Sequence, residues 1–286
     1  MTFNKRIITE FVTGSHLYGM ATPNSDLDLR GVCLEDEVDI YGLGSFEQFE
    51  DPVGDRVIYG LRNFFKLARD SNPNIIEFFF VKENRIENAR MQRLWTYIQS
   101  QKYFFISRRV TKTFAGYVTS QRKRMDTHYR WMMGNPPVKP KPEDYGQYYK
   151  DGTPKWSNPN LKSQYENLLK DYQSYETWET NRNKTRHDTE KKYGYDTKHG
   201  SHIFRLLEEV DELHHYGTIT FPRPDAENLK YIRNGGVSYE QLNKLIDAKI
   251  DYINNVAHPN SVLPEKHNQE AIEDLLINIY RMELRR

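Results

Sequence analysis

The hydrophobic pattern of the first hundred residues changes between the periods of strands and helices. Residues 6–12 are rich in β-branched and aromatic side chains and predict a strand. Residues 26–34 alternate polar and apolar side chains, which is typical of a half-buried strand, and residues 55–61 repeat this alternation. Helical spacing then runs from Leu61 to about Arg69 and from Asn74 to about Phe80. The pattern predicts a compact unit of strands and helices.

Helical patterns dominate the rest of the chain. Residues 91–133 are helical and basic, residues 134–160 are rich in Pro, Gly and Tyr and predict a long loop, and residues 161–195 are polar and rich in tyrosine. An amphipathic helix is predicted from about Thr197 to His215, with five apolar residues on its core face: Ile203, Leu206, Leu207, Val210 and Leu213. Three further helices are predicted near residues 225–233, 238–256 and 269–286.

These patterns together predict an α+β fold. We expect a core in residues 1–100, with a small mixed sheet and flanking helices, followed by a mainly helical region in residues 101–286. That region carries a basic, tyrosine-rich insertion at about residues 134–195.

Charge and composition narrow the class of protein. The formal net charge is +1, but residues 101–200 hold about 20 Lys and Arg against about 11 Asp and Glu, which favours a polyanionic partner. The single cysteine, Cys33, excludes an internal disulfide and a cysteine-rich zinc site, and its apolar neighbours indicate a buried thiol. We find neither the apolar region of a signal peptide nor an apolar run of ~20 residues, so we expect a cytoplasmic protein without a membrane partner.

The candidate chemistry lies between the first two predicted strands. Gly14-Ser15 follows the first strand, a short helix is predicted at His16–Gly19, and a dense turn signal covers residues 22–25. Asp26 and Asp28 are one residue apart, so on a strand both carboxylates would point to the same face. Two such carboxylates repel each other unless a metal neutralises them, and Mg²⁺ prefers a few carboxylates with substrate phosphate oxygens. A glycine beside amides at a helix start suits a phosphate.

This arrangement resembles the nucleotidyltransferase superfamily of DNA polymerase β. The motifs Gly14-Ser15-His16-Leu17-Tyr18-Gly19 and Ser25-Asp26-Leu27-Asp28-Leu29-Arg30-Gly31 are similar to those of its RNA-repair-pathway (RlaP-like) family. Three later stretches also resemble that family, at residues 55–65, 72–77 and 195–199. The resemblance implies a polymerase β-type core and a site in which Gly14, Ser15 and Ser25 bind the nucleotide.

The superfamily resemblance implies a third metal-binding carboxylate on a neighbouring strand. Asp55 is our choice because it opens the alternating segment at residues 55–61, and Glu50 and Asp51 are its rivals. Asp55 would bind the catalytic metal and help to deprotonate the incoming hydroxyl. Arg30 lies on the same predicted strand face as Asp26 and Asp28, where it would contact phosphate, brace the carboxylates or serve as a salt-bridge partner.

The predicted helix from Thr197 adds a polar stripe beside its apolar face. Lys198, His202, Arg205 and Glu209 form this stripe, and we place Lys198 and His202 among the nucleotide-binding residues if that helix end meets the cleft. The alternative is a solvated helix face. His199 lies near the middle of the apolar arc, which favours a hydrogen-bonded core histidine.

The middle of the chain combines cations with aromatic residues. Basic residues cluster within 108–130, and tyrosines and tryptophans follow as far as Trp178. Cations that follow a phosphate backbone and rings that stack on bases suit RNA or single-stranded nucleic acid, while rings that pack on each other are the alternative.

We therefore predict a nucleotidyltransferase that uses Mg²⁺, with Mn²⁺ as an alternative, at a site of Asp26, Asp28 and Asp55 that holds two metal ions. It would move a nucleotidyl group from an NTP such as ATP to an acceptor hydroxyl and release pyrophosphate. The family resemblance points to an RNA or tRNA end as acceptor. A protein or small-molecule hydroxyl, or a non-catalytic protein that binds nucleotide or RNA with the same fold, are the alternatives.

Overall fold

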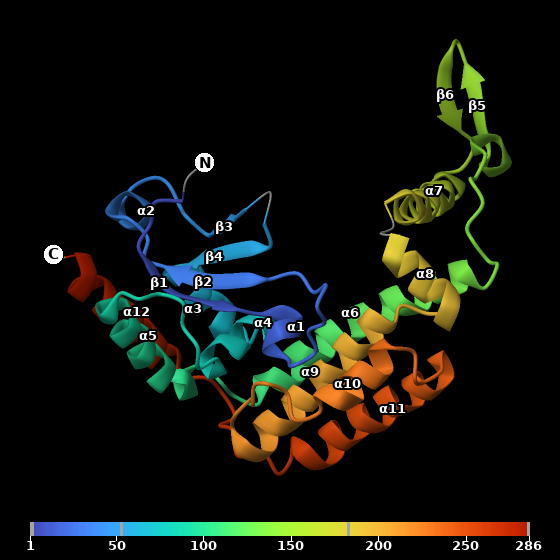
Figure 1. The fold of residues 1–286 in the computed structure, drawn as a ribbon. Coiled ribbons are helices and arrows are strands. Elements are labelled where there is room, and N and C mark those ends of the chain that lie inside the picture. Colours follow the sequence, from blue (N-terminus) through green and yellow to red (C-terminus); the bar gives the residue numbers. More distant parts are fainter. Residues whose placement is uncertain (1–2, 52–53, 182–183, 285–286) are drawn as a thin grey trace.

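The protein has an α+β fold built on a four-stranded mixed sheet (Figure 1). The computed structural model describes residues 3–51, 54–181 and 184–284. The sheet order is β1-β2-β4-β3, and the strands are β1 (Ile7–Val12), β2 (Leu29–Cys33), β3 (Gln48–Glu50) and β4 (Arg56–Gly60). β2 is parallel to β4, whereas β1 pairs antiparallel with β2 and β3 pairs antiparallel with β4. The predicted α+β class is confirmed.

The strand predicted at residues 26–34 is shorter than expected. It begins at Leu29, and Asp26 and Asp28 lie in an irregular segment before it. The ladder ends there because its partner leaves: Val12 pairs with Leu29, and the next residues of the first strand turn away into a helix at Gly14. The last contact is the amide of Thr13, which donates to the carbonyl oxygen of Asp28 at 2.8 Å.

Helices α3 (Leu61–Arg69), α4 (Pro73–Ile76) and α5 (Ala89–Ser100) cover one face of the sheet, with a 3₁₀ turn at Glu77–Phe80. A buried aromatic cluster joins the two layers. The ring of Phe11 on β1 lies 4.6 Å from that of Phe78, and Phe64 on α3 contacts both Phe78 and Trp95. Burial of these large side chains stabilises the association of sheet and helices.

The last helix returns to this core from the far end of the sequence. α12 (Gln269–Leu284) packs against α3, and the hydroxyl of Tyr280 donates to Oε2 of the buried Glu35 at 2.7 Å. A short helix, α2 (Glu37–Tyr41), follows Glu35. The sequence predicted a helix to residue 286, of which residues 285–286 lie outside the described part.

A second group of helices packs beside the sheet. It contains α6 (Arg109–Met132), α9 (Thr197–Tyr216), α10 (Ala226–Arg233) and α11 (Tyr239–Tyr252), which continues into a π-helical turn at Ile253–Ala257. α9 lies at the centre and contacts α6, α10 and α11. All five residues of its predicted apolar face are buried, which confirms the amphipathic helix.

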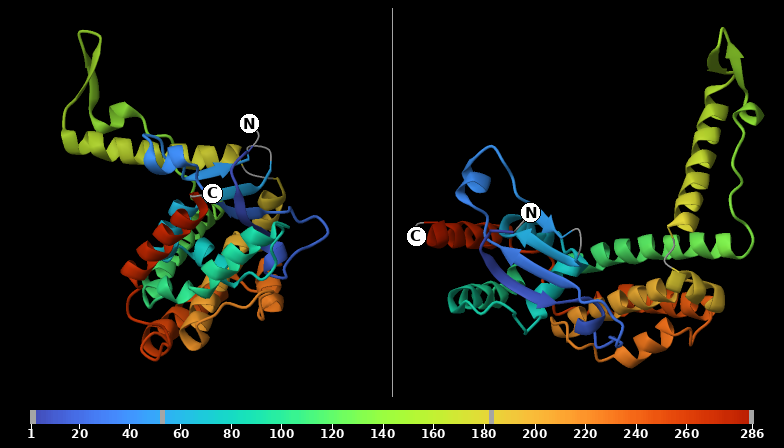
Figure 2. Two further views of the ribbon diagram at one scale, coloured as in Figure 1. Left: turned by 90° about the vertical axis from the view of Figure 1, so that its left-hand side faces the viewer. Right: turned by 45° about the horizontal axis from the view of Figure 1, so that its top comes forward.

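The long loop predicted at residues 134–160 is wrong in part. The segment contains a short 3₁₀ turn (Pro142–Tyr145) and a hairpin of β5 (Gln147–Lys150) and β6 (Thr153–Trp156). Asp151 and Gly152 form its tip with φ angles of +53° and +72°, the conformation that Asp-Gly favours in a two-residue hairpin. Helices α7 (Pro159–Thr180) and α8 (Lys184–Tyr193) follow. The hairpin and α7 project from the body (Figures 1 and 2).

Candidate active site

A tight turn after β1 forms the first wall of the candidate site. Helix α1 (Gly14–Leu17) begins at Gly14, whose φ of +63° favours glycine over other residues. The amide of Met20 donates to the carbonyl of Ser15 at 2.8 Å and closes the turn. Ser25 fastens the following loop because its hydroxyl accepts from the amide of Thr22 at 2.8 Å. The strand therefore leads directly into a short, closed turn.

Asp26 and Asp28 line a cavity of about 460 Å³ together with this turn. Asp26 is exposed and Asp28 is half-buried. Among the described residues, neither carboxylate has an ion pair or a side-chain hydrogen bond with the protein. Two neighbouring carboxylates without a protein counter-ion are the feature of this cavity that a bound cation would explain.

The N-terminal part of α9 forms the opposite wall. Lys198, Ser201, His202 and Arg205 line the cavity from α9, and Arg233 lines it from the end of α10. Thr197 ties these helices together, since its hydroxyl donates to the carbonyl of Arg233 at 2.8 Å. The cavity thus combines residues that lie more than 200 positions apart in the sequence, from Gly14 to Arg233.

Seven of the nine residues predicted for the site line this one cavity: Gly14, Ser15, Ser25, Asp26, Asp28, Lys198 and His202. Asp55 and Arg30 do not. The sequence analysis missed Arg233, which has no ion pair with another described residue. Its proximity depends on the packing of α10 against α9, and no local pattern signals that contact.

Asp55 is next to Asp28 in the strand register but does not line the cavity, and in this structure it forms no close group of metal-ligand atoms with Asp26 and Asp28. The amide of Leu29 donates to the carbonyl of Asp55 at 2.8 Å, and the parallel register of Leu29 with Arg56, extended by one residue, places Asp28 next to Asp55. The rival Glu50 lies further along, opposite Val57 on β4. Of these acids, Asp55 is the nearest to Asp28 in the strand register.

Arg30 connects the two strand ends instead of entering the cavity. Its Nη1 donates to the carbonyl oxygens of Leu29 at 2.8 Å and Asp55 at 2.9 Å. In this structure Arg30 therefore braces the backbone that carries Asp28 and Asp55, and its guanidinium makes no ion pair with another described residue.

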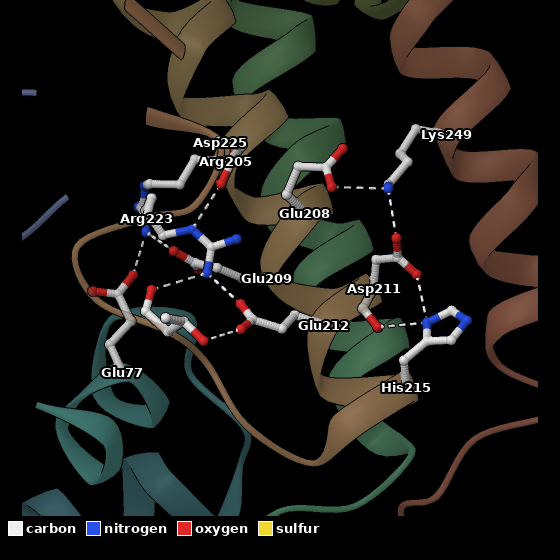
Figure 3. A network of polar contacts seen from close by, with 11 residues as sticks. Glu77, Arg205, Glu208, Glu209, Asp211, Glu212, His215, Arg223, Asp225 and Lys249 are labelled. Carbon is white, nitrogen blue, oxygen red and sulfur yellow. Dashed lines mark hydrogen bonds and ion pairs between the residues drawn. The ribbon is translucent and has the colours of Figure 1, made fainter. Parts of the chain in front are cut away.

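Arg205, which lines the cavity, belongs to a buried charge network (Figure 3). Arg205 lies between the carboxylates of Glu77 and Glu209, and all three side chains are almost fully buried. Its guanidinium also lies over the ring of Tyr18, 4.0 Å from the ring centre, and the hydroxyl of Tyr18 donates to Glu77 at 2.9 Å. Burial raises the pKa of Glu209 to about 8, although the charge of Arg205 acts in the opposite direction.

This network determines the state of His202. Nη2 of Arg205 lies 3.0 Å from Nδ1 of His202, and because a guanidinium only donates, Nδ1 accepts and Nε2 carries the proton. Burial and then the charge of Arg205 lower the pKa of His202 to about 3. His202 is therefore a neutral N–H donor near pH 7, so Lys198 and Arg233 are the cations of the cavity beside Arg205.

His199 does not line this cavity; it is hydrogen-bonded as predicted, but it is half-buried beside a cleft and is not a core residue. Its Nδ1 lies 2.6 Å from Oδ2 of Asp196, which also caps α9 by accepting from the amide of His199. Asp196 lies with His128 and Glu190 in a group whose ligand-type atoms are within 4.8 Å of one another. These residues belong to a neighbouring cleft between α6, α7 and α9.

The residues of the cavity suit a divalent cation. Asp26 and Asp28 supply hard oxygen ligands that no described residue pairs with, and the cavity leaves room for phosphate oxygens and water, which Mg²⁺ retains in such sites. Cys33 is buried elsewhere and no thiol lines this cavity, which favours a hard cation over a soft one.

None of the described helices is long and apolar enough to cross a membrane. No solved structure matches the chain. A protein of Enterobacteria phage T4, the "Uncharacterized 38.9 kDa protein in nrdC-mobD intergenic region", is 27% identical over 124 residues. The match covers 39% of this chain and 36% of the phage protein, so the chain spans little more than a third of that relative.

The family comparison covers far more of the chain. The model of the "RNA repair pathway DNA polymerase beta family", RlaP, matches residues 2–257. This range includes the Gly14 turn, the two aspartates and the α9 and α10 walls of the cavity. The chain therefore belongs to the RNA repair pathway DNA polymerase beta family, RlaP.

Proposed function

We propose that the protein transfers a nucleotidyl group from an NTP to an acceptor hydroxyl, with Mg²⁺, and releases pyrophosphate. One observation carries the proposal: Asp26 and Asp28, which make no ion pair with another described residue, line one cavity with Gly14-Ser15 and the cations Lys198 and Arg233. Polymerase β-like proteins suggest a nucleotidyltransferase role for this family, and the geometry agrees with it.

Each wall of the cavity has a role in this reaction. Asp26 and Asp28, with Asp55 as the third carboxylate, would hold the divalent ion, which supplies positive charge to the phosphates and to the attacking oxygen. The amides of the Gly14-Ser15 turn bind phosphate oxygens. Lys198 and Arg233 bind the remaining negative charge of the triphosphate, and the Nε2–H of His202 donates a hydrogen bond to it. Asp55 takes part in removing the proton of the acceptor hydroxyl.

The family description favours an RNA end, including a tRNA end, as acceptor. A protein or small-molecule hydroxyl is the alternative within the same chemistry. A non-catalytic nucleotide-binding protein is less favoured, because two adjacent carboxylates without counter-charge would repel a triphosphate that arrives without a metal.

A labelling experiment tests the proposal. The protein is incubated with each α-³²P-labelled NTP, Mg²⁺ and total RNA, and in parallel with a cell lysate treated with ribonuclease. We expect label on RNA, and label on a protein in the treated lysate would identify the alternative acceptor.

The double variant Asp26→Asn, Asp28→Asn is the matched control. It should fold, as judged by circular dichroism, and lose at least about 100-fold in turnover, because it removes the two carboxylates that bind the metal. Full activity of this variant would contradict the proposed function.

A further inference from the structure

A long groove runs along helix α6 beside the candidate active site. One cavity, of about 1130 Å³, lies between α6, α7 and the start of α9, and a second, of about 760 Å³, lies along the first half of α6. Both are lined by Ser120 and Gln121, so they adjoin. The α6 groove, as we call their union, extends along α6 from Arg109 to Trp131, a distance of ~33 Å at the rise of an α-helix.

Cations line the α6 groove along its length. Five of them have no ion pair with another described residue: Lys112, Lys123, Arg124, Lys170 and Lys198. Arg109 pairs with Asp70 at 3.3 Å, across an exposed contact. The acids of the groove, Glu190 and Asp196, are buried, and Asp196 is engaged by His199. The accessible charge of the groove is therefore positive.

Aromatic side chains form the far end of the groove. Trp131 on α6 and Trp178 on α7 have ring centres 5.1 Å apart, and His128 stacks on Trp131 at 5.4 Å. Both tryptophans are partly exposed. α7 has no fully buried residue, and Tyr175 and Trp178 on α7 contact Trp131 on α6 at this end of the groove.

The α6 groove meets the candidate active site at Lys198. This side chain lines both the larger groove cavity and the cavity of Asp26 and Asp28. A chain bound along α6 would therefore pass beside the carboxylates.

We propose that the α6 groove binds the acceptor as an unpaired nucleic-acid strand and delivers its terminal hydroxyl to the site of Asp26 and Asp28. The inference rests on the proposed function for the reaction, while the groove itself supplies the class of acceptor. The phosphates of such a strand would account for the row of cations. Its unpaired bases would stack on the two tryptophan rings. A small molecule would occupy only a fraction of a ~33 Å groove.

Binding of a fluorescein-labelled single-stranded RNA oligonucleotide to the full chain, followed by anisotropy over a range of salt concentrations, tests the groove. The variant Lys123→Ala, Arg124→Ala should bind at least about 10-fold more weakly. Its plot of log K against log salt should lose up to ~1.4 units of slope, which corresponds to two phosphate contacts on a single strand. The matched control Lys139→Ala, Lys141→Ala removes two cations from the neighbouring exposed segment outside the groove and should bind as the unmodified chain does.

A second variant separates stacking from charge. Trp178→Ala should weaken binding of the oligonucleotide by about 5-fold or more and leave the salt slope unchanged, since stacking contributes ~1–3 kcal/mol per base. A DNA oligonucleotide of the same sequence reports whether the 2′-hydroxyl is recognised. If polyglutamate competes as well as RNA does, the groove binds acidic chains in general and the inference is overturned.

The outcomes distinguish this inference from the proposed function. Unchanged RNA affinity of the Lys123→Ala, Arg124→Ala variant overturns the groove assignment, even if Asp26 and Asp28 prove essential for turnover. Conversely, the Asp26→Asn, Asp28→Asn variant should keep its RNA affinity. If that variant keeps its turnover as well, the proposed function fails while the groove assignment stands.

Discussion

A Cβ atom placed on Gly14 would lie 2.0 Å from Oδ2 of Asp28. The φ of Gly14 is +63°, so an alanine there would also be strained. We predict that Gly14→Ala displaces the Asp28 carboxylate and lowers turnover by about 100-fold, the cost expected for a shift of about 1 Å in a catalytic group. Steady-state nucleotide incorporation measures this loss.

Gly44→Ala is the matched control for that change. A Cβ on Gly44 would meet no atom within 4 Å, and its backbone does not require glycine. Turnover of this variant should equal that of the unmodified chain. Equal turnover of Gly14→Ala would show that the Gly14–Asp28 contact does not shape the site.

The third carboxylate can be identified by comparing two acids. Asp55 lies beside Asp28 in the strand register, whereas Glu50 lies opposite Val57. We expect Asp55→Asn to lose at least about 100-fold in turnover, since it removes a metal ligand and a proton acceptor. Glu50→Gln should stay within about 2-fold of the unmodified chain. The reverse order of these effects would assign the role to Glu50.

Lys198 and Arg233 should determine the affinity for the triphosphate. Each is a cation of the candidate cavity without an ion pair to another described residue, so each is available to phosphate. Lys198→Ala and Arg233→Ala should each raise the Kd for an NTP about 10-fold, the effect of one charge-assisted hydrogen bond. Isothermal titration calorimetry with a non-hydrolysable NTP and Mg²⁺ measures it. Lys230→Ala, which removes a cation of α10 that pairs with Glu227, is the control and should bind normally.

Arg205 should be essential for stability as well as for the shape of the site. Its removal leaves Glu77 and Glu209 buried without their cation. We predict that Arg205→Met lowers the free energy of unfolding by about 3–5 kcal/mol, as measured by urea denaturation. Arg122→Met, which breaks a partly exposed ion pair with Asp247, should cost less than about 1 kcal/mol. Similar losses for both variants would contradict the role of the buried network.

The stability of the fold should fall in mild acid because of His202. Its pKa is lowered to about 3, so below the unfolded pKa of 6.5 the unfolded chain takes up a proton that the folded chain excludes. The stability associated with neutral His202 is fully present above pH 6.5 and is lost as the pH falls toward 3. The free energy of unfolding should fall by about 2 kcal/mol by pH 5. His202→Gln should show a smaller difference in unfolding free energy between pH 7.5 and pH 5. An unchanged difference would mean that His202 is not buried in its neutral form.

The sequence predicted the local elements of the site better than their surroundings. The Gly14 turn and the α9 face follow from short-range rules of turn geometry and helical period, and both were found. The hairpin at residues 147–156 has the Asp151-Gly152 signal at its tip, yet the surrounding prolines concealed it. β3 is three residues long and, among the described strands, pairs with β4 alone, so too little pattern exists to predict it. Arg233 joins the cavity through long-range packing, which no period encodes.

The contact between Tyr280 and Glu35 has a consequence for how the chain folds during synthesis. Glu35 is buried next to the sheet, and its Oε1 already accepts from the amide of Arg62, within the first quarter of the chain. Its other oxygen gains a partner only when α12 arrives, after every other described element has left the ribosome. A nascent chain that carries the complete sheet but not yet α12 therefore still exposes the surface of α3 that α12 later covers.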